Sequence, residues 1–239
     1  MCPLRSEVLT SERLLRVASR VLPGAPMADV GTDHALLPAH LVRSGRIPSA
    51  LACDARPGPL EQASTTIARH ALGDRITTRL GDGLTPLAPE DGVATITICG
   101  MGAATIQKIL TEVDPEPLCS RLVLQPNTDA RRLRALARAR DWCLTDEELV
   151  LESGRFYHVL QLDLGDPFTA HEAHEDMLFG EAVRRRATPA FGLWLRTRRD
   201  MLDTKRAHMQ RARAPDTARI DALAVELAMI ERELRRVLA

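Results

Sequence analysis

Two acidic residues flank one glycine in the segment Asp29-Val30-Gly31-Thr32-Asp33-His34. Gly31 permits a tight turn and a close approach of a ligand to the backbone, and a helix starting at His34 would offer free backbone amides to that ligand. The segment is not GxGxxG, because Asp33 stands where a second glycine would fall, and its charge would repel a pyrophosphate. Carboxylates suit a ligand with a cationic amino group instead, such as the methionine end of S-adenosylmethionine. We therefore favour S-adenosylmethionine over NAD.

Two further acids follow later apolar segments. Asp54 ends the second segment, where it could accept hydrogen bonds from ribose hydroxyls or cap a helix that begins near Pro57. Asp82 stands between Gly81 and Gly83, where it could accept from an adenine amino group or simply occupy a turn. In an open parallel sheet, ligands bind at the carboxyl ends of the strands. Three acids after three successive strands would therefore meet in one nucleoside pocket.

The next two segments end in small and amide side chains. Gly100 and Gly102 follow the fourth segment and would let the backbone run close to the group being modified. Cys99 could be a nucleophile, but no local motif ties a histidine to it, so we expect a buried thiol. Gln125 and Asn127 end the fifth segment, where they could orient a substrate, although Asn127 could equally cap a helix.

Short apolar runs alternate with helix-like segments over the first two thirds of the chain, which predicts a parallel sheet with helices on both faces. The expected strands are 27–30, 50–54, 75–80, 94–99 and 121–125, and the expected helices are 34–43, 59–71, 103–112 and 129–140. Two more strand-like runs, Glu147–Glu152 and Arg155–Leu164, are separated only by Ser153-Gly154, which predicts an antiparallel hairpin at the edge of the sheet. The expected fold class is α/β and Rossmann-like, with five parallel strands plus this hairpin.

The chain changes character after Gly165-Asp166-Pro167, and residues 196–239 are helical in composition. Two helices here could fold back on each other as an antiparallel hairpin or form a dimerising coiled coil, and the short connection between them favours the hairpin. We expect a sheet domain over residues 1–165 and a helical, coiled-coil-like domain over residues 166–239, in a monomer. The expected apolar seam, which has heptad spacing, consists of Ile220, Leu223, Leu227, Ile230, Leu234 and Val237.

Composition narrows the class of protein. Hydrophobic residues make up 45% and charged residues 27%, within the range of ordinary globular domains. No apolar run approaches the ~20 residues that span a bilayer, and Met1–Leu22 lacks the pattern of a signal peptide, so we expect a soluble, cytoplasmic protein without a membrane partner. The five cysteines include no CxxC, and His171 and His174 do not form HExxH, so we expect neither a disulfide framework nor a metal site.

The formal net charge is zero, but basic residues are concentrated in two stretches of the chain. Residues 131–140 contain five arginines and no acid, and residues 184–213 contain ten basic residues against two acidic ones. Such stretches either contact a polyanion or form a solvated surface.

In order along the chain, these motifs resemble those of the bacterial tRNA (adenine-N1)-methyltransferases that modify adenine 22 of tRNA. The resemblance covers about Arg13 to Leu164. It implies a class I methyltransferase domain with a helical C-terminal domain, S-adenosylmethionine as the methyl donor and tRNA as the substrate. It rests on Ala28–His34 with Leu37-Pro38, on Gly58-Pro59, on Gly81–Leu84, on Ile96–Gly102 and on Leu122–Asn127.

The resemblance also implies roles for single residues. The cofactor-binding residues would be Asp29, Gly31, Thr32, Asp33, His34, Asp54, Asp82, Gly83 and Gly100, and the catalytic residues would be Asp33, Gly100, Met101 and Gly102. Asp54 stands where the family usually has glutamate, and Ala103 stands where it tends to have a further glycine, so the methyl group of Ala103 could narrow the target pocket. We expect tRNA contacts from Gln125, Asn127, Arg131, Arg132, Arg134, Arg184, Arg185, Arg186, Arg198 and Arg199.

Adenine N1 carries a lone pair that can attack a sulfonium methyl group directly, so positioning can supply most of the acceleration. Asp33 is our candidate for stabilising the charge that develops on the base. Two other functions remain open from the residues alone. The chain could methylate another RNA or a small molecule, or it could be an inactive methyltransferase-like scaffold whose tail binds a partner protein. The three acids argue against the scaffold, which would not need them.

Overall fold

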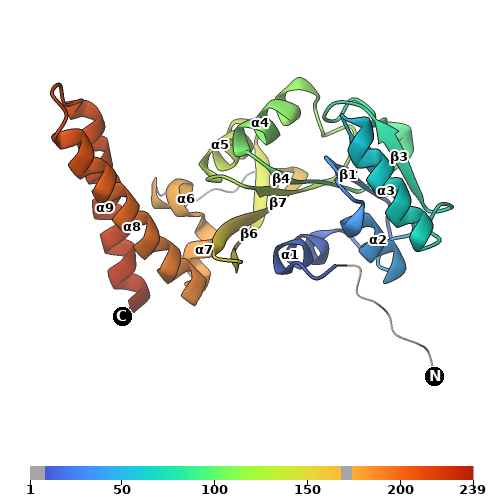
Figure 1. The fold of residues 1–239 in the computed structure, drawn as a ribbon, viewed down its shortest axis with the longest axis horizontal. Coiled ribbons are helices and arrows are strands. Elements are labelled where there is room, and N and C mark those ends of the chain that lie inside the picture. The colour runs from blue at the N-terminus through green and yellow to red at the C-terminus, as the bar shows by residue number, and fades with distance from the viewer. Residues whose placement is uncertain (1–8, 168–173, 239) are drawn as a thin grey trace. The chain divides into compact units, whose positions relative to one another are not determined.

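The structure is a computed structural model that describes residues 9–167 and 174–238 (Figure 1). The chain divides into two compact units, Met1–Glu172 and Ala173–Ala239. The first unit contains a seven-stranded sheet with the strand order β3-β2-β1-β4-β5-β7-β6. Its strands are β1 (Met27–Val30), β2 (Ala50–Asp54), β3 (Ile76–Leu80), β4 (Thr95–Met101), β5 (Arg121–Pro126), β6 (Trp142–Glu152) and β7 (Arg155–Pro167).

The first five strands pair in parallel, and β7 pairs antiparallel with both β5 and β6. The predicted α/β fold with five parallel strands and an edge hairpin is therefore confirmed. Strand β6 begins at Trp142 rather than at the expected Glu147, because register shifts at Trp142/Cys143 and Leu144/Asp146 interrupt its pairing with β7. Such bulges break the period of two that marks a strand in sequence.

Helices cover both faces of this sheet, and the helices on each face pack on a separate apolar cluster (Figure 1). Helices α4 (Ala103–Glu112) and α5 (Arg131–Ala139) contribute Ile106, Leu110 and Leu133 to one cluster. Helices α1 (Glu12–Arg20), α2 (Leu36–Arg43) and α3 (Pro57–Arg69) contribute to the other, and a 3-10 turn (η1) spans Pro89–Asp91. Burial of apolar side chains on both faces stabilises such a layered domain.

Helix α1 is absent from the elements expected from sequence. It begins after Ser11, whose hydroxyl accepts a hydrogen bond from the backbone N–H of Leu14 at 3.3 Å, an N-cap that satisfies one free donor of the first turn. Its Val17 and Ala18 are buried against the sheet. The helix matters for function because it brings Arg13 to the edge of the site described below.

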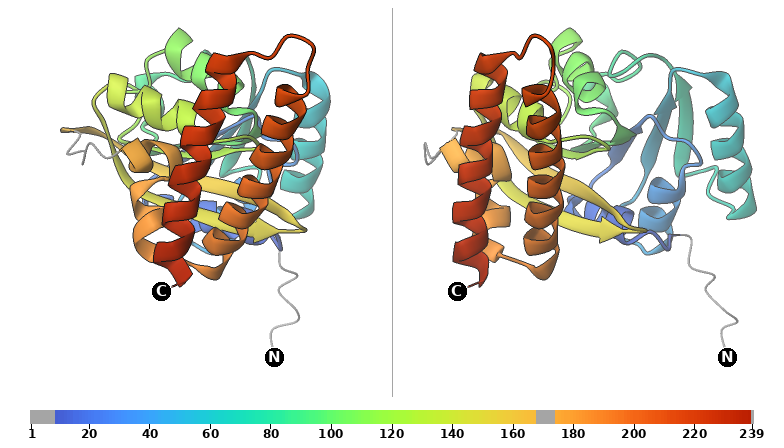
Figure 2. Two further views of the ribbon diagram at one scale, coloured as in Figure 1. Left: turned by 90° about the vertical axis from the view of Figure 1, so that its left-hand side faces the viewer. Right: turned by 60° about the vertical axis from the view of Figure 1, so that its left-hand side comes forward.

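The second unit is helical, as expected, and its helices begin well before residue 196. Helix α8 starts after Thr188, which caps it, and has proline at its first position, where a missing N–H costs nothing. Helices α8 and α9 lie antiparallel and side by side, which confirms the predicted helical hairpin (Figure 2). Arg198 on α8 pairs with Glu226 on α9 at 2.6 Å, and four of the six predicted seam residues are buried. The helices are α6 (His174–Phe179), α7 (Glu181–Arg186), α8 (Pro189–Gln210) and α9 (Thr217–Leu238).

Across the described ranges 9–167 and 174–238, every helix is too short or too polar to cross a membrane.

Candidate cofactor and substrate site

Two adjoining hollows lie at the carboxyl ends of the parallel strands, where an open sheet of this kind binds its ligands. The larger has a volume of about 470 Å³, and the smaller a volume of about 180 Å³. Gly31, Asp54, Arg56 and Met101 line both, so the two form one continuous groove across the ends of β1, β2 and β4.

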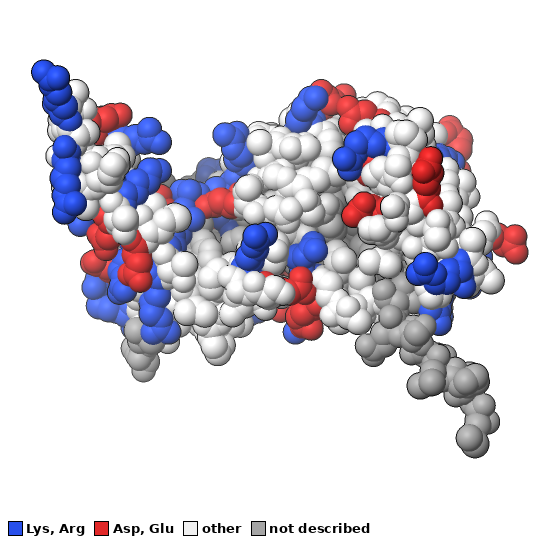
Figure 3. Space-filling view, in the orientation of Figure 1, with Lys and Arg blue, Asp and Glu red and all other residues white. Residues whose placement is uncertain are grey.

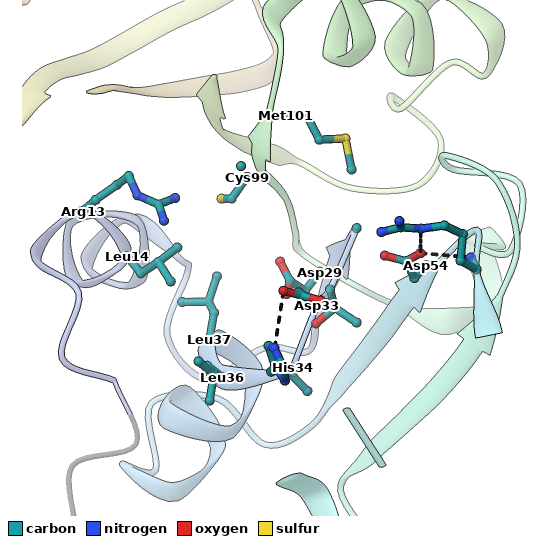
Figure 4. A pocket seen from close by; sticks show the side chains of 15 residues that line it. Arg13, Leu14, Asp29, Asp33, His34, Leu36, Leu37, Asp54, Cys99 and Met101 are labelled. Carbon is teal, nitrogen blue, oxygen red and sulfur yellow. Dashed lines mark hydrogen bonds and ion pairs between the residues drawn. The ribbon is translucent and has the colours of Figure 1, made fainter. Parts of the chain in front are cut away.

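The groove gathers most of the residues singled out in the sequence. The larger hollow is lined by Asp29, Gly31, Thr32, Asp33, His34, Asp54, Gly100 and Met101, several of which are drawn in Figure 4. Asp82 and Gly83 line the smaller hollow, beside Lys108 and Glu112 from α4. Gly102 is not among the lining residues of either hollow and instead immediately precedes α4.

Asp29 lies deep in the groove, with only 7% of its surface exposed. The hydroxyl of Thr97 donates a hydrogen bond to its Oδ1 at 2.6 Å. Burial raises the pKa of Asp29, against the opposing effect of that hydrogen bond. A ligand cation placed nearby would stabilise the carboxylate, which is the chemistry expected for the amino group of a methionine moiety.

Asp33 and His34 stand at the open side of the same hollow (Figure 4). The side chain of Asp33 is 75% exposed, and its Oδ2 lies 3.4 Å from Nε2 of His34. Ala35 then takes a left-handed conformation with φ of 51°, which turns the chain into α2. Asp33 is therefore the carboxylate in this loop that a large incoming substrate can reach.

Asp54 lies where the two hollows meet. Its Oδ1 accepts a hydrogen bond from the backbone N–H of Arg56 at 2.9 Å, and the Arg56 Nε lies 3.6 Å from the same oxygen. This bond holds the turn ahead of α3, but the N-cap of α3 is Arg56 and no side chain caps the helix, so Asp54 is not the helix cap that the sequence allowed. Asp54 lines both hollows, as the ribose interpretation requires.

Sequence reasoning missed several lining residues, of which Arg13 on α1 is the most informative. Its guanidinium points into the larger hollow from the wall opposite Asp54 (Figure 4). Nη1 of Arg13 donates to the side-chain oxygen of Gln125, and its Nε lies 3.6 Å from Glu152. The one local signal for this residue is the capping Ser11 ahead of an amphipathic stretch. Leu14, Leu36, Leu37, Arg56 and Cys99 also line the hollow.

Cys99 lines the larger hollow, but its surroundings do not favour the nucleophilic thiolate form. Burial raises the pKa of its thiol well above the usual range, so the thiolate is scarce at neutral pH. Cys99 is half-buried, not fully buried as expected, but the raised pKa of its thiol argues against a covalent role.

Gln125 and Ala103 differ from the expectations for them. The side chain of Gln125 is fully buried and bonded to Arg13 and to the backbone N–H of Gly100, so it is not displayed to RNA. The methyl group of Ala103 packs in the apolar cluster under α4 and leaves the pocket unchanged. Asn127 is exposed, and its side chain donates to the carbonyl of Gly100 at 2.5 Å.

Arg134 was expected to contact tRNA, and the structure contradicts this. It is 3% exposed and makes two hydrogen bonds to Glu147, at 2.6 and 2.9 Å. His158 Nδ1 lies 2.6 Å from the same carboxylate. Burial works to raise the pKa of Glu147, but Arg134 and His158 outweigh it and lower this pKa to about 2. Arg134 therefore ties α5 to the edge hairpin.

The remaining predicted RNA contacts fall into two groups. Arg184 and Arg198 are largely covered and pair with Asp176, Glu233 and Glu226 of their own unit, so they hold its helices together. Figure 3 shows basic side chains displayed over this unit. The more exposed candidates are Arg131 and Arg132 on α5, Arg185 and Arg186 on α7, and Arg199 on α8.

Within residues 9–167 and 174–238, no cluster of three or more His, Cys, Asp or Glu side chains could hold a metal ion. His171 and the side chain of His174 lie outside the described part of the chain.

Known proteins share this fold and sequence. The methyltransferase domain family matches residues 10–160. The tRNA (adenine(22)-N(1))-methyltransferase of Bacillus subtilis strain 168 is 33% identical over 229 residues, covering 93% of this chain and 94% of that protein. The crystal structure of the B. subtilis m1A22 tRNA methyltransferase TrmK has a TM-score of 0.86 and 28% identity, covering 95% of this chain and 100% of that one. Streptococcus pneumoniae Sp1610, solved in complex with S-adenosyl-L-methionine, has a TM-score of 0.84 and 30% identity with the same coverage.

The strand order, the groove at the strand ends and the domain match define a methyltransferase of the Rossmann-like class. Within that class, the chain belongs to the family of tRNA (adenine(22)-N(1))-methyltransferases.

Proposed function

We propose that this chain transfers a methyl group from S-adenosylmethionine to N1 of adenine 22 in tRNA. One observation carries the proposal beyond family membership. Asp82 lines the smaller hollow, Asp29 and Arg13 line the larger, and Asp54 lines both and so lies between them. These are acceptors for an adenosine, an acceptor for an ammonium group and a donor for a carboxylate, in the order in which the cofactor carries those groups.

The groove fits the cofactor sterically as well as chemically. Gly31 has φ of +77°, and a Cβ built on it would lie 2.0 Å from Cε of Met101. A side chain at this position would have to displace the end of Met101, which lines both hollows. The Arg13 guanidinium would bind the methionine carboxylate, Asp29 its amino group, Asp54 the ribose hydroxyls and Asp82 the adenine amino group.

When bound, the cofactor supplies an activated sulfonium methyl group for in-line attack by N1 of the target adenine. Gly100 leaves the groove wall bare, since nothing lies within 4 Å of a Cβ built on it, so a planar base can approach the backbone there. Asp33 would stabilise the positive charge that the ring gains and would accept the proton from N6. Its exposure at the mouth of the hollow gives a base room to reach it.

N1 lies on the Watson–Crick edge, so the target adenine must be unpaired or turned out of its helix before it can react. Binding of the surrounding tRNA would rest on phosphate contacts from Arg131 and Arg132 and from the exposed arginines of the second unit. Aromatic residues are 3% of the chain, which argues against recognition by a platform of stacked bases.

We further propose that the enzyme acts as a monomer in the cytoplasm. The burial of Leu223, Leu227, Ile230 and Leu234 supports this, because a covered seam offers little to a second copy. Light scattering at working concentration tests the oligomeric state, and a stable dimer would contradict the proposal.

The test of function is methyl transfer from tritiated S-adenosylmethionine to an unmodified tRNA transcript, followed by nucleoside analysis. We expect 1-methyladenosine in a transcript with A22 and none when A22 is replaced by G. Asp33→Asn should lower the single-turnover rate at least tenfold while the affinity for S-adenosylhomocysteine stays within twofold. Label in another nucleoside, or equal label in both transcripts, would contradict the proposed target.

A further inference from the structure

The loop from Gly100 to Gly102, which includes the last two residues of β4, is held in place by Gln125 near the end of β5 and by Asn127 just after it. The side-chain oxygen of Gln125 accepts a hydrogen bond from the backbone N–H of Gly100 at 3.1 Å. Asn127 binds the loop twice, through its side chain to the Gly100 carbonyl at 2.5 Å and through its backbone N–H to the Met101 carbonyl at 2.7 Å. These bonds fix a glycine with φ of +75°, a conformation that glycine adopts without strain and that its neighbours must select.

The same oxygen of Gln125 also binds Arg13. Nη1 of Arg13 donates to it, while Glu152 contacts the guanidinium Nε at 3.6 Å and the ring of Tyr157 lies 5.0 Å from its central carbon. Gln125 is fully buried, and its amide nitrogen donates to Asn127 at 3.3 Å. One carbonyl oxygen therefore joins the guanidinium on one wall of the hollow to the loop on the other.

We propose that Gln125 is a positioning residue that sets the distance between Arg13 and the Gly100–Gly102 loop. In this arrangement Asn127 helps Gln125 to hold the loop and has no role in holding Arg13. The inference rests on the proposed function, in which Arg13 holds the methionine carboxylate and the loop faces the target base. Gln125 then fixes where the methyl group sits relative to the base. This role replaces the direct substrate contact expected for Gln125 from sequence.

Two substitutions separate the contact of Gln125 with Arg13 from the contacts that hold the Gly100–Gly102 loop. Gln125→Met keeps the length of the side chain but removes the oxygen, so it should weaken binding of S-adenosylhomocysteine at least tenfold. It should leave binding of 5′-methylthioadenosine, which has no carboxylate, within twofold of wild type. Asn127→Ala should lower the single-turnover methylation rate at least tenfold and leave the affinity for S-adenosylhomocysteine within twofold.

A ligand-free measurement keeps this test separate from the test of function. Amide hydrogen exchange at Gly100, followed by NMR, should be at least tenfold faster in Gln125→Met and unchanged in the exposed control Gln62→Met. If the wild-type protein methylates no tRNA, the proposed function fails, while the exchange rate still reports on the link. Unchanged exchange at Gly100, or equal loss of affinity for both ligands in Gln125→Met, would overturn the inference.

Discussion

The terminal methyl group of Met101 occupies the side of Gly31 on which a side chain would stand, and a Cβ built on Gly31 would lie 2.0 Å from it. The contact falls where the two hollows of the groove meet. The positive φ favours glycine at this position, and any side chain here would also have to displace the end of Met101.

Gly31→Ala should therefore weaken cofactor binding as well as the fold. A methyl group there forces Met101 aside and narrows the passage, so we expect the affinity for S-adenosylhomocysteine to fall more than tenfold by calorimetry. Gly24→Ala is the matched control, because Gly24 has φ of +75° with nothing within 4 Å of a Cβ. It carries only the backbone strain, about 1–2 kcal/mol of stability, and should bind the cofactor normally. Normal binding by Gly31→Ala would contradict the placement of the cofactor.

Arg13→Gln should weaken binding of the methionine part of the cofactor and leave binding of its adenosine part unchanged. Loss of the guanidinium removes the donor for the methionine carboxylate, and charge-assisted hydrogen bonds of this kind contribute about 1.5–3 kcal/mol. We expect a loss of tenfold or more in affinity for S-adenosylhomocysteine and little change for 5′-methylthioadenosine. Arg16→Gln, three residues on along α1, is the control, since Arg16 pairs with Glu12 and Glu148 and does not line the groove. Equal losses for both ligands would mean that Arg13 does not bind the carboxylate.

Glu147→Gln should destabilise the first unit without touching the groove. It leaves Arg134 buried beside a neutral amide, and removing one partner of a buried pair costs about 3–5 kcal/mol of the free energy of unfolding. Because the folded pKa of Glu147 is about 2 and its ordinary value is 4.5, the unfolded chain binds more protons between those pH values. The stabilisation is therefore complete above pH 4.5 and is lost as pH falls toward 2.

Urea unfolding at several pH values measures both effects. Wild type should lose stability between pH 4.5 and 2, and Glu147→Gln should lose less over the same range. The exposed pair of Glu12 and Arg16 gives the control, and Glu12→Gln should change stability by less than about 1 kcal/mol. Parallel pH profiles for wild type and Glu147→Gln would show that Glu147 is not the titrating group.

Charge reversal at Arg185 and Arg186 should weaken tRNA binding and reduce its dependence on salt. Arg185 is 69% exposed and pairs only weakly, at 3.4 Å, with the exposed Glu181. If each arginine contacts one phosphate, the double variant should lower the slope of log affinity against log salt by about two. Arg69→Glu on α3 is the control for each single reversal, Arg185→Glu and Arg186→Glu, because all three lower the net charge by the same amount. An unchanged slope would place the RNA elsewhere.

The parallel sheet could be predicted because each strand is a short apolar run with a turn former after it, a signal contained within a few residues. The same local signals placed Asp29, Asp54 and Asp82 at strand ends. Because a parallel sheet brings the carboxyl ends of its strands to one edge, the groove at that edge could be predicted as well.

Arg13 and Arg134 could not be predicted in the same way, because their roles depend on partners distant in sequence. Arg134 stands in a helix among other arginines, and only the position of Glu147 on β6 decides that it turns inward. Arg13 enters the site because α1 packs beside the end of β5 and meets Gln125. Periodicity places residues on faces of helices and strands, but it does not say which distant element will cover that face.

The central claim is that the groove binds S-adenosylmethionine through carboxylates and an arginine rather than a dinucleotide through glycines. Calorimetric titration of the full chain with S-adenosylhomocysteine and, separately, with NAD tests it most directly. We expect one molecule of S-adenosylhomocysteine per chain, binding at least tenfold weaker in Asp54→Asn, and no heat of binding with NAD. Binding of NAD, or an affinity for S-adenosylhomocysteine that Asp54→Asn leaves intact, would contradict the account.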